Sequence, residues 1–325
     1  MKCVLIGNYG VGNLGDDALR EYFLTRFPDI RWTVLSASPH GDHEVPRLPF
    51  GLRSLLTTPW WKTVSSIRHC DAVVFGGGSL FTDVESSRAC LLWWWHAFVA
   101  RIFGKPVFLA FQGIGPFRTR MGEWCAKDVI SRATFVSVRD GQSRDRASTF
   151  ARARATVDKG VRIVEAFDPV ISLLRHDREP AVGNVLGVIP RLNSGTDFRN
   201  LVVASIERDT PQSVRIITMQ PDNRDEQALC SSLIATIGSR ATLHPVRTLQ
   251  KLSEEVSVCN RVISARYHGA IAALAAGVPV EIVPQAAGDK LDALRAVKDR
   301  TDVDRICALV TEGQEELLKS LNMVK

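Results

Sequence analysis

An arginine and a histidine stand two residues apart in the motif Arg266-Tyr267-His268-Gly269, directly after the apolar run at residues 261–264. Side chains two residues apart point the same way when the backbone is extended. A guanidinium can hold an anionic group while a neighbouring imidazole transfers a proton. The motif therefore predicts a site that combines anion binding with acid-base chemistry, and the alternative is a structural histidine.

A second candidate for anion binding is Arg139, which follows the apolar segment at residues 135–138. The planar fork of donors on an arginine suits a carboxylate or a phosphate. The alternative is an ion pair at the surface between Arg139 and Asp140.

The chain opens with a glycine-rich turn in which Gly10, Gly12 and Gly15 have the spacing of a dinucleotide-binding loop. However, Asp16 and Asp17 would occupy the N-terminus of the following helix, where their charge repels a pyrophosphate. No acid for a ribose follows the second predicted strand either. We therefore expect a sugar-binding loop, and the alternative is a helix cap. Its candidate acceptor-binding residues are Asn8, Tyr9, Asn13, Asp16 and Asp17.

A glycine triplet at residues 76–78 follows another predicted strand. Glycines allow a ligand to approach the backbone closely, so Gly77, Gly78 and Ser79 are further candidates for acceptor binding. Asp83 could orient an acceptor hydroxyl. The alternative is a flexible loop.

Alternating strands and helices must position these residues. Apolar runs predict strands at residues 2–7, 31–36, 71–75, 106–111, 135–138, 185–189, 215–219, 261–264 and 280–283. Helical patterns lie at residues 16–26, 86–103, 197–208, 225–237, 249–259 and 268–276. This alternation predicts an α/β protein with parallel sheets, whose ligands bind at the carboxyl ends of the strands.

A proline-containing, charged stretch divides the chain near its middle. We expect an N-terminal Rossmann-like domain at residues 1–177, on the acceptor side, and a C-terminal one at 178–325, on the donor side. Two such domains would face a cleft. A last helix at residues 303–321 is expected to pack back on the first domain.

Composition narrows the class of protein. The 325 residues carry a formal charge of +6, but the basic residues are scattered, which argues against nucleic acid and indicates a bias toward small anions. Seven cysteines without a CxxC pair argue against disulfides and structural zinc, and we expect no metal. No signal peptide or spanning segment is visible, so we expect a cytoplasmic protein.

Several motifs in order carry a family resemblance: GNYGVGNLGDDAL at the start, then GGGSLFTD, QGIGP, SVRD, the segment at residues 220–222 and ARYHGAIAALAAGVPV. Together they resemble the polysaccharide pyruvyl transferase family over roughly residues 3 to 295. The resemblance implies a glycosyltransferase-B-like fold, phosphoenolpyruvate as co-substrate and no further cofactor. It implies that Arg139, Arg266 and His268 contact the donor, with Gly269 in the same motif and Lys290 as an additional cation.

A mechanism follows from that resemblance as a hypothesis. The cations would hold the donor's phosphate and carboxylate, and His268 would protonate its methylene carbon. A sugar hydroxyl would attack the resulting cation, its proton passing to Asp16 or Asp83, and phosphate would leave. The acceptor would be a polysaccharide or a lipid-linked precursor, for example on polyprenyl diphosphate. Peripheral contact at the inner face of the plasma membrane is a further expectation, with Trp60 and Trp61 exposed in a loop.

Two alternatives remain open. A nucleotide-sugar-dependent glycosyltransferase could have the same fold, although Glu281 is the only visible candidate to bind a ribose. A non-catalytic module that binds sugars or anions could also share it.

Overall fold

The chain forms two compact units. The computed structural model describes residues 1–84, 86–152, 161–174, 183–192, 194–284, 290–297 and 300–324. Unit 1 comprises Met1–Pro169 and Ile306–Lys325, and unit 2 comprises Val170–Arg305. The boundary expected between residues 177 and 178 lies outside the described residues.

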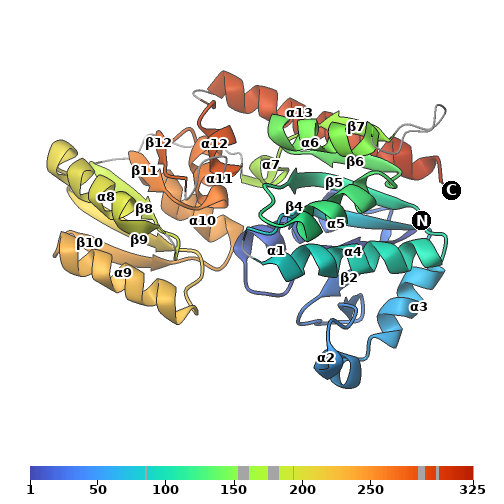
Figure 1. The fold of residues 1–325 in the computed structure, drawn as a ribbon. Helices are drawn as coiled ribbons and strands as arrows, with labels where there is room; N and C mark the ends of the chain where they lie inside the picture. Colours follow the sequence, from blue (N-terminus) through green and yellow to red (C-terminus); the bar gives the residue numbers. More distant parts are fainter. Residues whose placement is uncertain are drawn as a thin grey trace. The chain divides into compact units, whose positions relative to one another are not determined.

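Unit 1 is built on a seven-stranded parallel sheet with the order β3-β2-β1-β4-β5-β6-β7 (Figure 1). Its strands are β1 (Lys2–Ile6), β2 (Arg31–Ser36), β3 (Glu44–Pro46), β4 (Ala72–Phe81), β5 (Val107–Ile114), β6 (Phe135–Val138) and β7 (Arg162–Glu165). Its helices are α1 (Leu14–Arg26), α2 (Leu52–Thr57), α3 (Trp61–His69), α4 (Ser87–Ile102), α5 (Arg120–Ile130), α6 (Gly141–Arg152) and most of α13 (Arg300–Asn322).

Unit 2 repeats the scheme on a five-stranded parallel sheet with the order β10-β9-β8-β11-β12. Its strands are β8 (Val185–Ile189), β9 (Ser213–Thr218), β10 (Ala241–Pro245), β11 (Arg261–Ser264) and β12 (Val280–Ile282). Its helices are α7 (Val170–Leu174), α8 (Gly195–Asp209), α9 (Arg224–Ile237), α10 (Leu249–Ser257), α11 (Tyr267–Ala275) and α12 (Lys290–Leu294). The predicted fold class, with two Rossmann-like parallel sheets, is confirmed.

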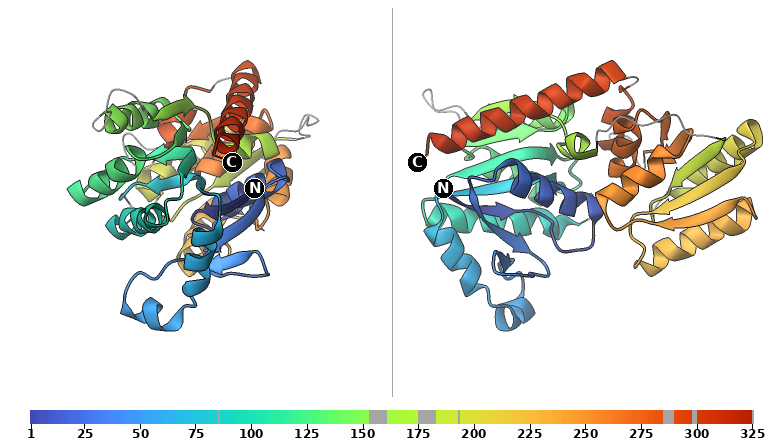
Figure 2. Two further views of the ribbon diagram at one scale, coloured as in Figure 1. Left: turned by 90° about the vertical axis from the view of Figure 1, so that its right-hand side faces the viewer. Right: turned by 180° about the vertical axis from the view of Figure 1, so that it is seen from behind.

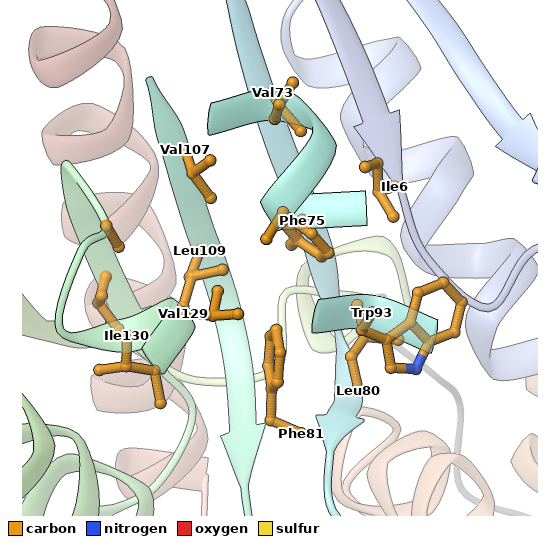
Figure 3. Close-up of a cluster of buried hydrophobic side chains, with 14 of the residues drawn as sticks. Ile6, Val73, Phe75, Leu80, Phe81, Trp93, Val107, Leu109, Val129 and Ile130 are labelled. Carbon is orange, nitrogen blue, oxygen red and sulfur yellow. The ribbon is translucent and has the colours of Figure 1, made fainter. Parts of the chain in front are cut away.

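Apolar side chains cover both faces of the unit 1 sheet. On one face, residues of β4 and β5 pack against Trp93 of α4 and Val129 and Ile130 of α5 (Figure 3). On the other face, Tyr22 and Phe23 of α1 form edge contacts with other aromatic rings, including that of Phe111. These two layers hold the carboxyl ends of the strands in fixed positions.

The final helix packs on unit 1. Gln314 of α13 accepts a hydrogen bond of 2.9 Å from the Tyr22 hydroxyl, and Glu316 pairs with Arg162 of β7. A methyl group on Gly313 would lie 2.6 Å from Cβ of Ala166, so the helix backbone approaches the end of the sheet closely. Figure 2 shows α13 lying along the body of unit 1.

The glycine triplet belongs to a strand, which corrects the prediction of a strand ending at residue 75. β4 continues through Gly76, Gly77 and Gly78 to Phe81, and its register against β5 shifts between Gly78 and Phe81. Gly77 and Gly78 both have φ of +83°, a conformation that glycine adopts at little cost. The glycines therefore bend a strand rather than form a flexible loop.

Six of the seven cysteines are buried and none forms a disulfide, as expected for small core residues. Within the described part of the chain, no helix is long and apolar enough to cross a membrane.

Candidate functional site

Arg266 occupies the N-cap position of α11, just beyond the end of β11. Its guanidinium donates to the backbone oxygen of Pro190 at 3.3 Å, to Oε1 of Gln220 at 3.0 Å and to Oε2 of Glu226. These partners follow β8 and β9, so three neighbouring strand ends converge on one arginine. The arginine is therefore fixed at the edge of the sheet where parallel folds bind ligands.

Glu226 is the residue that holds Arg266 in place. It is fully buried in the first turn of α9. Its Oε1 accepts from the Thr218 hydroxyl at 2.8 Å and from the backbone N–H groups of Met219 and Gln220 at 3.2 and 3.1 Å. A buried carboxylate is stable in an apolar protein when it is paired and hydrogen-bonded in this way.

Sequence reasoning missed Glu226. An acid in the first turn of a helix normally indicates an interaction with the helix dipole, and Asn223 already caps α9 through Asp225 and Glu226 N–H groups. The pattern therefore gave no reason to expect a buried partner for Arg266. Thr218, which also belongs to the network, gave no signal either, and Gln220 was indicated only as part of the segment at residues 220–222 in the family resemblance.

The other predicted donor residues of unit 2 lie around the start of α11. The rings of Tyr267 and His268 meet edge to face with centroids 5.3 Å apart, and Lys290 Nζ lies 5.6 Å from the centre of the Tyr267 ring. A methyl group on Gly269 would lie 2.9 Å from Ile189 Cδ1 and from Ser264 Oγ, so glycine allows α11 to approach the sheet. Unit 2 thus brings Arg266, His268 and Lys290 together.

The electrostatics of this cluster favour an anion. The first turn of α11 contains no acidic residue, and the N-terminus of a helix carries a partial positive charge. Arg266 and Lys290 add two positive charges there, and the buried carboxylate of Glu226 balances the charge of Arg266. The cluster can bind an anionic group and place it beside an imidazole.

In unit 1, Asp16 is the centre of the glycine-rich loop. Its Oδ2 accepts from the side-chain amides of Asn8 at 2.9 Å and Asn13 at 2.8 Å. Asn13 is the cap of α1, through the N–H of Gly15, and Asp17 accepts from the N–H of Gly10 at 3.3 Å. The structure thus joins Asn8, Asn13 and Asp16 into one polar group.

Two predicted acceptor contacts have structural roles instead. The ring of Tyr9 is buried and its hydroxyl donates to the oxygen of Gly76 at 2.8 Å. Burial, with Asp16 nearby, raises the Tyr9 pKa well above its usual value. A methyl group on Gly77 would lie 2.8 Å from Leu19, so this glycine faces α1. Gly78 is different, because its missing Cβ would lie 3.4 Å from Asp16 Oδ1.

Asp83 was predicted to orient an acceptor hydroxyl, but its carboxylate is buried and engaged in hydrogen bonds. Oδ1 accepts from the N–H of Arg118 at 2.5 Å, and Oδ2 from the N–H of Thr119 at 2.7 Å and from its hydroxyl. Burial raises the Asp83 pKa, but these hydrogen bonds outweigh burial and hold the pKa below its ordinary value. Such a carboxylate fixes the entry to α5 and is a poor general base.

Arg139 is buried at the end of β6 in unit 1. Its guanidinium donates to the Ser79 hydroxyl and lies 3.8 Å from carboxylate oxygens of both Asp140 and Asp168. A methyl group on Gly113 would lie 2.4 Å from Arg139 Nη2. The surface pair considered from the sequence is therefore a buried one, and Ser79 serves as a partner of Arg139.

Arg47 is a further polar residue at this edge that the sequence did not indicate. Its Nη2 donates to Asn8 Oδ1 at 3.2 Å and to the oxygen of Tyr9 at 3.0 Å, and its guanidinium lies over the Trp93 ring at 5.1 Å. Burial lowers the pKa of Arg47 and Asp16 opposes this effect. Arg47 sits in an irregular segment without a recognisable motif, so no pattern could have placed it.

The structure describes no group of three or more His, Cys, Asp or Glu residues that could hold a metal ion. The predicted residues form two groups, each within its own unit. Asn8, Asn13, Asp16 and Arg139 belong to unit 1, and Arg266, His268 and Lys290 to unit 2.

Comparison with known proteins gives both a family and a fold. The model of the family described as polysaccharide pyruvyl transferase matches residues 13–281. No curated protein sequence matches significantly.

Solved structures resemble the chain at low identity. Anabaena HepE, in complex with UDP and glucose, has a TM-score of 0.61 at 14% identity and covers 99% of this chain and 100% of its own. S. aureus MnaA with UDP has a TM-score of 0.55 at 11% identity, covering 98% and 95%. The lipopolysaccharide outer core galactosyltransferase WaaB has 0.51 at 13%, covering 99% of each chain. These likenesses establish a glycosyltransferase-B-like fold.

Proposed function

Because the chain belongs to the polysaccharide pyruvyl transferase family, we propose that it transfers the enolpyruvyl group of phosphoenolpyruvate to saccharide hydroxyls. The product is a pyruvate ketal. The observation that carries this proposal is the cluster of Arg266, His268 and Lys290 at the start of α11. A donor with a phosphate and a carboxylate needs cations, and its reactive methylene carbon needs an acid.

The donor would bind in unit 2. Arg266, oriented by Glu226 and Gln220, and Lys290 would hold the two anionic groups together with the N-terminus of α11. His268 would give a proton to the methylene carbon, leaving a cationic centre at the adjacent carbon. The acceptor oxygen bonds to that centre and the C–O bond to phosphate breaks. Loss of phosphate leaves a second cationic centre at that carbon, and a second hydroxyl bonds to it and loses its proton, which closes the ketal. Arg139 is a further candidate to contact the donor, from unit 1.

The acceptor would bind to the polar loop of unit 1. Asp16 is the remaining candidate for the base, because Asp83 is committed to α5. The carboxylate of Asp16 is only partly buried and lies beside Gly78, where no side chain intervenes. Asn8, Asn13 and Asp17 would orient the sugar. We assign the acceptor to polysaccharide precursors, with a polyprenyl-diphosphate-linked saccharide at the cytoplasmic face of the membrane as the preferred form. The proposal needs no cofactor.

A nucleotide-sugar-dependent glycosyltransferase is the second candidate, because HepE and MnaA were solved with UDP. This candidate needs a carboxylate that is available to bind the ribose of the nucleotide. Glu281 is half-exposed and lies 3.3 Å from Arg261 Nη2, so an arginine already engages this carboxylate. A non-catalytic sugar- or anion-binding module is the third candidate, and turnover would exclude it.

Thermal melting with phosphoenolpyruvate or UDP distinguishes the first two. A ligand that binds the native state raises the melting temperature, and the stabilisation grows with the logarithm of its concentration divided by Kd. We expect phosphoenolpyruvate to stabilise the wild type and Arg247→Ala, whose arginine pairs with exposed Asp222. We expect no stabilisation of Arg266→Ala, measured against its own unliganded melting temperature. Stabilisation by UDP alone would favour the glycosyltransferase.

Turnover tests the chemistry. Release of phosphate that depends on a saccharide acceptor is expected, and its absence with every acceptor tried would favour the binding module. His268→Ala should lower the rate about 100-fold or more, since acid catalysis contributes at least that much. A His268→Ala variant that keeps a tenth of the rate would remove His268 from this role.

A further inference from the structure

The short helix α2 presents an apolar stripe to solvent. Leu52, Leu55 and Leu56 have the i, i+3, i+4 spacing of one helical face, and they are 80%, 45% and 83% exposed. None of the residues of α2 is buried. The core of unit 1 therefore makes no use of these three leucines, and an exposed apolar patch of this kind marks an interaction surface.

The stripe continues into the start of α3. Trp61, the first residue of α3, is 61% exposed. Trp60 precedes it and donates its indole N–H to the oxygen of Leu55 at 3.0 Å, which ties the turn to α2. The prediction of a loop at Trp60 and Trp61 is thus corrected to the entry of a helix. Figures 1 and 2 show α2 projecting from the body of unit 1 in each view.

The charges around this stripe have one sign. Between Glu44 and Asp71 the chain contains no acidic residue, whereas Arg53, Lys62 and Arg68 are all exposed there. A segment that combines an exposed apolar stripe with basic residues and no acidic ones is typical of segments that insert into the interface of an anionic bilayer. A second copy of the chain would bring cations against cations in a symmetric contact, which is unfavourable.

We propose that α2 and the start of α3 dock unit 1 on an anionic phospholipid surface. Leu52, Leu55, Leu56 and Trp61 enter the boundary between headgroups and acyl chains, while Arg53 and Lys62 contact lipid phosphates. This surface shares no residue with the polar loop around Asp16 or with the cluster at α11. The proposal of lipid docking does not depend on whether the protein transfers pyruvyl groups.

Vesicle flotation tests the proposal directly. The purified chain is mixed with phosphatidylglycerol–phosphatidylcholine vesicles or with pure phosphatidylcholine vesicles. Wild type should float with the anionic vesicles and should be released by salt. Leu52→Ser/Leu56→Ser should lower the partition coefficient by at least about 30-fold, from the apolar surface lost. Arg53→Gln and Lys62→Gln should each lower it about fivefold.

The matched control is Ile102→Ser/Met323→Ser, two exposed apolar residues of unit 1 outside the stripe. It should bind vesicles like the wild type. Circular dichroism should show the same folded state in all variants, because α2 buries no residue. Wild type that does not bind anionic vesicles, or a double-serine variant that binds as tightly as wild type, overturns the proposal. The proposal is also overturned if the wild type is a dimer that does not bind vesicles and the double-serine variant is a monomer.

Discussion

Replacing Glu226 with glutamine should destabilise unit 2 and release Arg266. The substitution keeps the shape but removes the charge. A glutamine oxygen can still accept from Thr218, Met219 and Gln220, and its amide nitrogen then faces the donors of Arg266. Removing one partner of a buried ion pair costs about 3–5 kcal/mol. This is a large share of the roughly 5–15 kcal/mol that stabilises a typical domain.

Urea unfolding followed by circular dichroism measures this loss. With a slope of about 1–3 kcal/mol per molar urea, the midpoint should fall by at least about 1 M. Every tryptophan of the chain lies in unit 1, so tryptophan fluorescence reports that unit separately in the same samples. Glu207→Gln, an exposed site on α8, should change stability by less than about 0.5 kcal/mol.

A double-mutant cycle with Arg266→Met isolates the pair. In the double variant the glutamine amide no longer meets the guanidinium. The double loss should therefore be smaller than the sum of the two single losses by about 1–3 kcal/mol. Additive losses, or a Glu226→Gln midpoint equal to that of wild type, would refute the positioning of Arg266 by Glu226.

Three further predictions concern unit 1. Gly113→Ala should displace the guanidinium of Arg139 and lower the rate of transfer at least about tenfold. Gly141→Ala, with open space at its Cβ, should leave the rate unchanged, and equal transfer rates for the two variants would contradict the prediction. The pKa of Asp83 in the folded state is lowered from 3.8, so Asp83→Asn should lower the free energy of unfolding by about 1–3 kcal/mol at pH 7. The difference from wild type should narrow as pH falls below 3.8, and a constant difference in urea unfolding would refute the prediction. Burial lowers the pKa of His96 from 6.5 to about 4, so between these pH values only the unfolded state gains a proton. The free energy of unfolding of the wild type should therefore fall by about 2 kcal/mol from this residue between pH 7 and 5. His96→Gln should lack that part of the pH dependence, and identical pH dependence in both proteins would exclude the role of His96.

Much of the fold could be predicted because buried parallel strands are continuous apolar runs. The strands at residues 31–36 and 185–189 have the predicted bounds. β3, β7 and β10 were missed. All three are edge strands, and their sequences, EVP, RIVE and ATLHP, contain proline, charged or polar residues. Those short, partly exposed segments lack the apolar pattern on which the prediction depends.

The site was predictable only where a motif follows a strand. Arg266 and His268 were placed by such a motif and Lys290 by the family resemblance, and the structure brings them together. Asp83 also follows a strand, but its carboxylate is buried, because Arg118 and Thr119, distant in sequence and just before α5, supply its hydrogen-bond donors. Contacts between distant segments likewise decide the roles of Glu226 and Arg47, and such contacts cannot be predicted from a local sequence pattern.

The position of α13 has a consequence for synthesis of the chain. Unit 1 includes Ile306–Lys325, so unit 2 is an insertion within it and the polypeptide passes between the two units twice. As the ribosome extends the chain, the seven strands of unit 1 are complete long before α13 emerges. Until then Tyr22 lacks Gln314 and Phe111 lacks its cover at Gly313. Emergence of α13 from the ribosome, rather than completion of the sheet, therefore sets the moment at which unit 1 can close.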